Sequence, residues 1–325
     1  MLSEFQLIAR YFKRSSRAGG PVQLGVGDDC ALLQPPIGEL LAVSTDMLIE
    51  GRHFFAGANP YDLGHKALAV NLSDLAAMGA QPISFTLALA LPTSDPHWLQ
   101  PFSEGLFHLA DAQDIELMGG DTTRGPLAIS ITVIGSVPNT LALKRSSAQA
   151  GDELWVSGTL GDARLALEIL QNKRTLAPDL FAKASERLHR PEPRVALGLA
   201  LRGIASAAID VSDGLLGDLS HLINQSSLSA TLFVDDLPFG EALSSQTIDT
   251  RYALALNGGD DYELCFSAPA DKRQAVIDAG QRSQTQVTCI GRLDKGSGIE
   301  IQDQQGKRIS AVNQSFDHFT ETHSS

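Results

Sequence analysis

The chain of 325 residues has few cysteines, no excess of positive charge and no long hydrophobic run. Its three cysteines, Cys30, Cys265 and Cys289, form no CxxC pair, so neither a disulfide framework nor a zinc site is indicated, and a cytoplasmic setting is expected. The net charge of −13 argues against a nucleic-acid partner, because DNA and RNA bind basic surfaces. No stretch approaches the roughly 18 apolar residues of a membrane span, so we expect no membrane partner either.

The best-known phosphate-binding motifs are also missing. There is no GxxxxGK(S/T) loop, and the pair Gly25 and Gly27 lacks the third glycine of a dinucleotide-binding loop. His189 and Arg190 are followed by Pro191 rather than by the Asp of a protein-kinase catalytic loop. If this chain handles phosphates, it therefore does so with another architecture.

The chain does contain six short acidic motifs, each with an Asp beside Gly, Ser, Thr or Asn. They are GDD (27–29), STD (44–46), NLSD (71–74), GGDTT (119–123), DVSDG (210–214) and GGDDYE (258–263). For one motif alone the simplest interpretation is a turn or a helix cap, but six of similar chemistry indicate a site. Converging carboxylates repel by roughly 3 kcal/mol per pair at about 5 Å and an effective dielectric of about 20. Hard divalent cations relieve this repulsion and prefer oxygen ligands, so the motifs indicate a multi-metal site that handles phosphates.

The alternation of strand and helix patterns predicts a mixed α and β chain, and its length predicts two domains. A helix from about Tyr61 to Met78 is predicted from Asn59 as its cap and from Pro60 in its first turn. This helix places Asp74 near its C-terminal end. Apolar runs such as Leu40 to Ser44 predict strands, so most of the acidic motifs are expected where a strand ends and a loop begins.

The ordered motifs resemble those of one known family. The set GDDCALL, STDMLIEGRHF, KALAVNLSDLAAMGAQP, GGDTTRGP, IDVSDGL and GGDDYELCF closely resembles thiamine-monophosphate kinase, and the resemblance extends from Glu4 to about Phe319. That family belongs to a superfamily with aminoimidazole ribonucleotide synthetase, selenophosphate synthetase and a hydrogenase maturation protein.

The resemblance implies an α/β fold of two domains in a homodimer. Residues 1–140 are expected to form an N-terminal domain that binds ATP and Mg²⁺, and that builds a β-barrel with its twin at the dimer interface. Residues 150–325 are expected to form a ferredoxin-like α/β domain.

The resemblance also implies the site residues, with several Mg²⁺ ions as cofactors and ATP as co-substrate. The expected magnesium ligands are Asp29, Ser44, Thr45, Asp46, Asp74, Asp121, Asp210 and Asp213. The expected ATP contacts are Gly120, Asp121, Arg145 and Ser212, and the expected contacts to thiamine monophosphate are His53, Asp260 and Phe316. Asp46, Asp74, Asp121 and Arg145 are expected to act in catalysis. Where the family often has GGED, this chain has GGDD, and the shorter Asp260 keeps the charge but not the reach. An isolated His such as His53 is more often a surface or packing residue.

The implied reaction is the transfer of a phosphoryl group from ATP to thiamine monophosphate, which gives thiamine diphosphate. The attacking phosphate oxygen is already ionised near neutral pH, because the second pKa of a phosphate monoester is about 6. No strong general base is then required, and catalysis would consist of positioning and of charge neutralisation by Mg²⁺ and Arg145.

Two alternatives remain open. The first is another ATP-dependent synthetase or dehydratase of the superfamily, although the chain lacks the N-terminal Cys followed by Lys, and the C-terminal Cys, that two such enzymes would need. The second is a catalytically inactive module that binds a nucleotide or a metal, although every expected Asp ligand is present.

Overall fold

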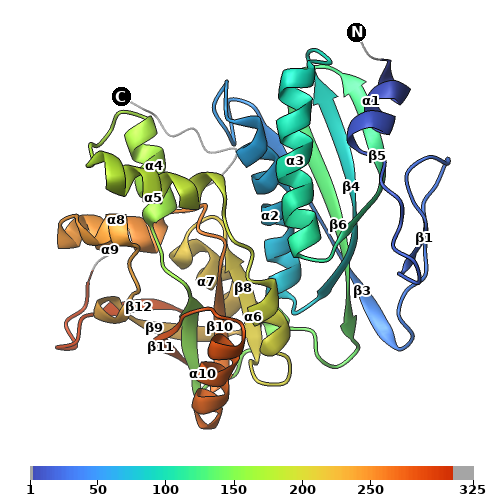
Figure 1. The fold of residues 1–325 in the computed structure, drawn as a ribbon. Coiled ribbons are helices and arrows are strands. Elements are labelled where there is room, and N and C mark those ends of the chain that lie inside the picture. The colour runs from blue at the N-terminus through green and yellow to red at the C-terminus, as the bar shows by residue number, and fades with distance from the viewer. Residues whose placement is uncertain (1–2, 310–325) are drawn as a thin grey trace. The chain divides into compact units, whose positions relative to one another are not determined.

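The computed structural model describes residues 3–309, which form two compact units (Figure 1). The first unit runs to Ala142 and the second starts at Leu143. Each unit has its own sheet, flanked by its own helices, so the expectation of a mixed α and β fold is confirmed. Among the described residues, no helix is both long enough and apolar enough to cross a membrane.

The first unit is built on a four-stranded sheet in the order β3-β6-β4-β5. The strands are β3 (Glu39–Ile49), β4 (Gln81–Leu91), β5 (Glu116–Arg124) and β6 (Ala128–Pro138). Strands β4 and β5 are parallel, whereas the other neighbours are antiparallel. The sheet is open within the chain, with β3 and β5 at its edges. A small ribbon of β1 (Val22–Leu24) and β2 (Leu32–Leu33) follows the N-terminal helix α1 (Glu4–Tyr11).

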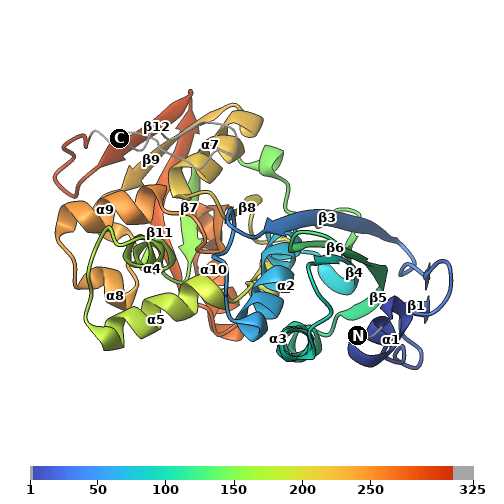
Figure 2. The same cartoon turned by 90° about the horizontal axis from the view of Figure 1, so that it is seen from above.

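Two helices, α2 (Pro60–Ala77) and α3 (Pro96–Ala112), cover one face of this sheet, as Figure 2 shows. Helix α2 starts as predicted, because the side chain of Asn59 accepts hydrogen bonds from two backbone N–H groups of the first turn and Pro60 follows it. The helix is buried along most of its length, because it lies between the sheet and α3. It therefore holds Asp74, in its last turn, at a fixed place over the sheet.

The opposite face of the sheet is apolar along β3. The side chains of Leu41, Val43 and Met47 are 43%, 61% and 53% exposed. They alternate with Ser44 and Asp46, whose side chains lie on the face that the helices cover. Exposed apolar side chains in a row along an edge strand mark a surface that needs a partner.

The second unit contains a six-stranded sheet in the order β12-β9-β11-β7-β10-β8. The strands are β7 (Asp152–Ser157), β8 (Ala207–Val211), β9 (Leu228–Phe233), β10 (Glu263–Pro269), β11 (Val287–Lys295) and β12 (Gly298–Gln302). The helices are α4 (Asp162–Leu170), α5 (Pro178–His189), α6 (Val195–Ala200), α7 (Leu215–Ser226), α8 (Glu241–Ser244), α9 (Ile248–Asn257) and α10 (Arg273–Arg282), with short 3-10 turns η1 (Arg145–Ser147), η2 (Val234–Asp236) and η3 (Ala270–Lys272). All neighbouring strands are antiparallel except β9 and β12.

The expectation that the acidic motifs lie where strands end is wrong for two of them. The STD motif lies inside β3, which continues to Ile49 instead of ending at Ser44. The GGDTT motif likewise lies inside β5. In both strands the run of apolar residues ends before the strand does. Both strands lie at sheet edges with polar or half-exposed positions, while hydrogen bonding to the neighbouring strand continues. The backbone thus fixes these residues more rigidly than a loop would.

Candidate functional site

In the first unit, the middle of β3 is tied to the last turns of α2. The hydroxyl of Ser44 donates a hydrogen bond to a carboxylate oxygen of Asp74 at 2.5 Å. The backbone N–H of Asp46 donates to the side-chain oxygen of Asn71 at 2.9 Å. The amide nitrogen of Asn71 in turn donates to the carbonyl of Ala67 at 3.0 Å, which fixes the orientation of that side chain. Strand alternation and helix packing therefore bring Ser44, Asp46 and Asp74 to one side of the sheet.

This group of oxygen atoms matches the chemistry of a hard divalent cation. Carboxylates and hydroxyls are the ligands that Mg²⁺ prefers, and Ser44 and Asp74 present both kinds within hydrogen-bonding distance. Within residues 3–309, however, no three acidic, His or Cys side chains form a group that could hold a metal ion by themselves. A metal site here would need further oxygen atoms, such as those of phosphates.

The strand register does not bring Asp46 and Asp121 to the same face of the sheet. Asp46 pairs with Ile131, which is buried under the helices. Asp121 pairs with Ala88, which is exposed. Thr45 also lies on the face away from the helices, where its hydroxyl shares a hydrogen bond of 2.8 Å with that of Thr132. Within one chain, the two carboxylates are thus separated by the sheet itself.

Two other predicted positions of the first unit lie apart from this sheet face. Asp29 is exposed in the loop between β1 and β2, where its backbone N–H donates to the side chain of Asp28 at 2.8 Å. His53 follows β3 and is half-buried, and its Nδ1 accepts the backbone N–H of Ile49 at 3.0 Å. That bond anchors the imidazole at the start of the loop 50–58.

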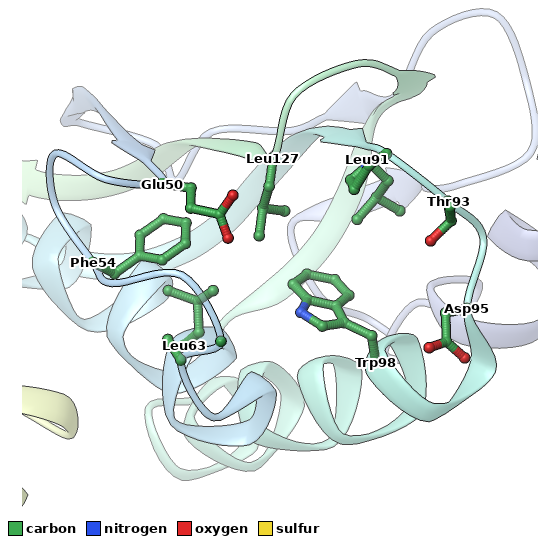
Figure 3. A pocket seen from close by; sticks show the side chains of 11 residues that line it. Glu50, Phe54, Leu63, Leu91, Thr93, Asp95, Trp98 and Leu127 are labelled. Atoms are coloured by element: carbon green, nitrogen blue, oxygen red, sulfur yellow. The ribbon is translucent and has the colours of Figure 1, made fainter.

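A pocket of about 200 Å³ lies beside this loop (Figure 3). Its wall is mostly aliphatic and aromatic, and the carboxylate of Glu50 points into the same hollow as the rings of Phe54 and Trp98. The indole of Trp98 is stacked on Phe102 with 4.7 Å between the ring centres, so its position is well supported. The remaining apolar side chains of the wall include Leu63, Leu91 and Leu127. Such a pocket suits a flat ring with a positive charge.

In the second unit, the DVSDG and GGDDYE loops lie side by side. Strand β8 carries the buried Asp210 and ends at Val211. The backbone N–H of Asp260 donates to the carbonyl of Ser212 at 2.9 Å, and that of Tyr262 donates to the carbonyl of Val211 at 2.8 Å. A side chain at Gly259 would meet the carbonyl oxygen of Ser212 at 2.5 Å, so only glycine permits this approach. Backbone hydrogen bonds therefore hold these two loops together within this unit.

Asp218, in the first turn of α7, is a residue that the sequence analysis did not select. One of its carboxylate oxygens accepts the backbone N–H groups of Ser212 and Asp213 at 3.0 and 3.1 Å. Burial and the nearby charge of Asp213 raise the pKa of Asp218 to about 7, while the charge of Arg145 acts in the opposite direction. The sequence did contain one indication of this role. Gly214, at the start of helix α7, has no side chain to cap the helix, so an Asp one turn later is a candidate for that task.

Arg145 begins the turn η1 and packs against α7. Its carbonyl accepts a hydrogen bond from the hydroxyl of Ser226 at 2.7 Å, which ties the turn to the far end of that helix. Since its guanidinium acts on the pKa of Asp218, Arg145 brings positive charge to the loop that holds Ser212 and Asp213. Phe316, the remaining predicted site residue, lies outside the described residues.

Two other acidic residues of the GGDDYE motif have structural roles. Asp261 is buried, and both of its carboxylate oxygens accept the backbone N–H of Gly161 at 3.0 Å. Glu263 is buried and forms ion pairs with Arg187 and Arg194, each at 2.6 Å. Burial raises the pKa of Asp261 well above its ordinary value. Burial also acts to raise the pKa of Glu263, but the two guanidinium groups outweigh it and the pKa is lowered. Asp261 and Glu263 are thus held inside the second unit by backbone and ion-pair contacts, and Asp260 is the acidic residue of this motif that remains a site candidate.

The two units match two known domain families. Residues 27–137 match the AIR synthase related protein, N-terminal domain, and residues 149–304 match the AIR synthase related protein, C-terminal domain. The chain is therefore a two-domain protein of the AIR synthase related class.

Individual relatives narrow this class. Thiamine-monophosphate kinase of Salmonella typhimurium (strain LT2) is 46% identical over 320 residues, which are 97% of this chain and 98% of that protein. A crystal structure of thiamine-monophosphate kinase from Stenotrophomonas maltophilia is 46% identical with a TM-score of 0.83, and the match covers 94% of this chain and 96% of that chain. A structure of AaThiL complexed with AMPPCP and TMP is 28% identical with a TM-score of 0.75, and the match covers 88% of this chain and 89% of that chain. The chain belongs to the thiamine-monophosphate kinase family.

Proposed function

We propose that this chain transfers a phosphoryl group from ATP to thiamine monophosphate and so forms thiamine diphosphate. The observation that carries the proposal is the identity of 46%, over almost the whole length, with kinases that act on this substrate by name. The test is to incubate the purified chain with ATP, Mg²⁺ and thiamine monophosphate and to separate the products by chromatography. We expect equal amounts of ADP and thiamine diphosphate. ADP without thiamine diphosphate would rule out this substrate.

The proposed transfer is direct and in line. A phosphate oxygen of thiamine monophosphate forms a bond to the γ-phosphorus of ATP, and the bond from that phosphorus to ADP breaks. No general base is needed, because the attacking oxygen carries a negative charge near neutral pH. The bound Mg²⁺ ions would neutralise the phosphate charges.

The residues of each unit would have separate tasks in this transfer. In the first unit, Ser44, Asp46 and Asp74 would hold Mg²⁺, because their oxygen atoms lie on one face of the sheet and Ser44 is bonded to Asp74. Thr45, Asp29 and Asp121 are proposed as further ligands. Gly120, also in the first unit, is proposed as a contact to ATP. In the second unit, Asp210 and Asp213 are proposed as magnesium ligands, and Ser212 and Arg145 as further contacts to ATP. The charge of Arg145 at the Ser212 loop supports this assignment. The strand order β11-β7-β10-β8, with antiparallel neighbours, supports the ferredoxin-like interpretation of the second unit.

A homodimer would explain two features of the first unit. The apolar face of β3 would be covered by a second copy, and two open sheets together could close into a barrel. Within one copy the register places Asp46 and Asp121 on opposite faces of the sheet, which disfavours their binding of the same metal ion. We therefore propose that each site takes Asp121 from the second copy.

The dimer is tested by charge placed on the apolar face. Sedimentation at micromolar concentration is expected to give about twice the chain mass of 34.6 kDa. Val43→Glu should shift the protein toward the monomer and lower its activity, because Val43 is 61% exposed on that face. The matched control is Phe5→Glu, at an apolar residue that is 81% exposed on α1. A wild-type monomer with full activity would refute the proposal.

The rings of thiamine monophosphate are proposed to bind near His53, in the pocket of Glu50, Phe54 and Trp98. The thiazolium ring is flat and positively charged. Aromatic faces attract such a ring by about 0.5–2 kcal/mol, and the carboxylate of Glu50 adds an attraction between opposite charges. Asp260 and Phe316 are proposed as further contacts to this substrate.

Glu50→Gln tests this placement, because it removes the charge and keeps the shape. The apparent KM for thiamine monophosphate should rise about threefold to thirtyfold, since 1.4 kcal/mol corresponds to about tenfold. The KM for ATP should stay nearly constant. The control is Phe55→Ala, which alters an exposed ring in the same loop but outside the pocket. A larger change for ATP than for thiamine monophosphate would place the rings elsewhere.

A further inference from the structure

The start of helix α7 is capped from within the helix. Gly214 precedes the helix and has no side chain, and it adopts φ of +114°. Asp218 donates its backbone N–H to the carbonyl of Gly214 at 3.0 Å, as expected for a first turn. Its side chain, 4% exposed, reaches back to the N–H groups of Ser212 and Asp213.

The loop from Val211 to Gly214 is consequently held from two sides. On one side, Asp218 accepts the N–H groups of Ser212 and Asp213. On the other side, the carbonyls of Val211 and Ser212 accept N–H groups from the GGDDYE loop. A side chain at Gly214 would meet the backbone carbon and oxygen of Asn257 at 2.8 Å, so the loop has no room to move in that direction.

We propose that Asp218 is a positioning residue for ATP and Mg²⁺ binding, which acts by fixing the peptide groups of Ser212 and Asp213 and touches neither ligand itself. The proposal rests on the proposed function, which assigns Ser212 to ATP and Asp213 to Mg²⁺. The reasoning is geometric. The backbone N–H groups of Ser212 and Asp213 both donate to the carboxylate of Asp218. Loss of that carboxylate therefore removes the restraint on both residues at once. A displacement of about 1 Å at a ligand-positioning residue can lower the rate about a hundredfold.

Asp218→Ala is expected to raise both the KM for ATP and the Mg²⁺ concentration for half-maximal activity by about tenfold or more. Asp218→Asn should stay within about threefold of the wild type for both constants, because its side-chain oxygen can still accept the two N–H groups. Isothermal titration with MgADP gives the affinity without any turnover, and should show the same order among the variants.

The matched control is Asp162→Ala. Asp162 is also buried in the second unit, and it accepts the backbone N–H groups of Ala242 and Leu243 at 3.4 and 2.7 Å at the start of α8. A purely structural role of Asp218 predicts that the two Ala variants lose thermal stability alike and leave the constants for ATP and Mg²⁺ unchanged. That result would overturn the proposal.

Amide hydrogen exchange provides a measurement that does not depend on a folded variant. In the wild-type protein without nucleotide, the amides of Ser212 and Asp213 should exchange as slowly as those of the neighbouring strand β8. Rapid exchange at both amides would mean that Asp218 does not fix the loop, and would overturn the proposal. Failure of the proposed function would look different, because the wild type would then bind MgADP without forming thiamine diphosphate.

Discussion

Replacing Asp74 or Asp121 by Asn is expected to lower the turnover number at saturating Mg²⁺ by at least about a hundredfold, the scale on which one electrostatic stabiliser acts. Each substitution keeps the shape of the side chain and removes one negative charge from the proposed metal ligands. Without metal, either variant should be at least as stable as the wild type, because repulsion between carboxylates is relieved. Steady-state kinetics over a range of Mg²⁺ concentrations measure the first effect, and thermal unfolding in a chelator measures the second.

Asp271→Asn is a suitable control, because Asp271 is exposed on the turn η3 and has no proposed role in the site. Its turnover should equal that of the wild type. If both Asp74→Asn and Asp121→Asn turned over at nearly the normal rate with saturating Mg²⁺, the assignment of metal ligands would be wrong.

Mixing two inactive variants tests which copy of the dimer supplies Asp121. Asp46→Asn and Asp121→Asn should each be inactive alone. If each site combines Asp46 of one copy with Asp121 of the other, a mixed dimer contains one intact site. Equal mixing would then restore up to about a quarter of the wild-type activity, because about half of the dimers are mixed. If both residues act within one copy, every site carries a substitution and no activity returns.

Glu263→Gln is expected to reduce the free energy of unfolding by about 3–5 kcal/mol at neutral pH, the cost of breaking a buried ion pair. The carboxylate is fully buried and binds Arg187, Arg194 and the hydroxyl of Ser157, the last at 2.6 Å. Without its charge, Arg187 would lose this ion pair and Arg194 would keep only its pair with the exposed Glu192. Urea unfolding at fixed pH measures the loss.

The contribution of Glu263 to the free energy of unfolding depends on pH. The pKa of Glu263 in the folded protein is lowered from its ordinary value of 4.5. Its contribution to stability is therefore complete above pH 4.5 and is lost as the pH falls through the lower folded value. The difference between wild type and Glu263→Gln should shrink in the same acidic range.

Glu192→Gln is the control, because Glu192 pairs with the same Arg194 at 2.7 Å but is 71% exposed, and it should change stability by about 1 kcal/mol or less. Equal losses in both variants would contradict a special role of the buried pair.

Local signals in the sequence were sufficient for some elements and insufficient for others. Helix α2 was predictable because its start depends on Asn59 and Pro60, which are neighbours in the chain. The end of β3 was not, because that strand is extended by pairing with β6, about 80–100 residues away. Sheet order and register also decide that Asp46 and Asp121 lie on opposite faces, and neither can be read from the motifs themselves.

The same limit applies to the acidic residues of the second unit. Asp260 and Asp261 are adjacent and look alike in the sequence, yet Asp261 accepts the N–H of Gly161, a residue far away in the chain. Asp218 follows Gly217 in the same way as the selected Asp residues follow Gly, but it was overlooked because it lies within a helical pattern of apolar residues. Which carboxylate binds a backbone group and which can bind a ligand depends on tertiary contacts that no short motif contains.

The hydrogen bond from the N–H of Asp260 to the carbonyl of Ser212 has a thermodynamic consequence. It joins a residue proposed for thiamine monophosphate to a residue proposed for ATP through a single backbone hydrogen bond. If binding of one ligand changes the fraction of molecules in which this hydrogen bond is formed, the affinity for the other ligand changes by a factor α. Linkage requires that the second ligand alter the affinity for the first by the same factor. Part of any cooperativity between the two substrates, of either sign, would then come from the backbone at this junction, in addition to the contact that the substrates make at the reacting phosphates.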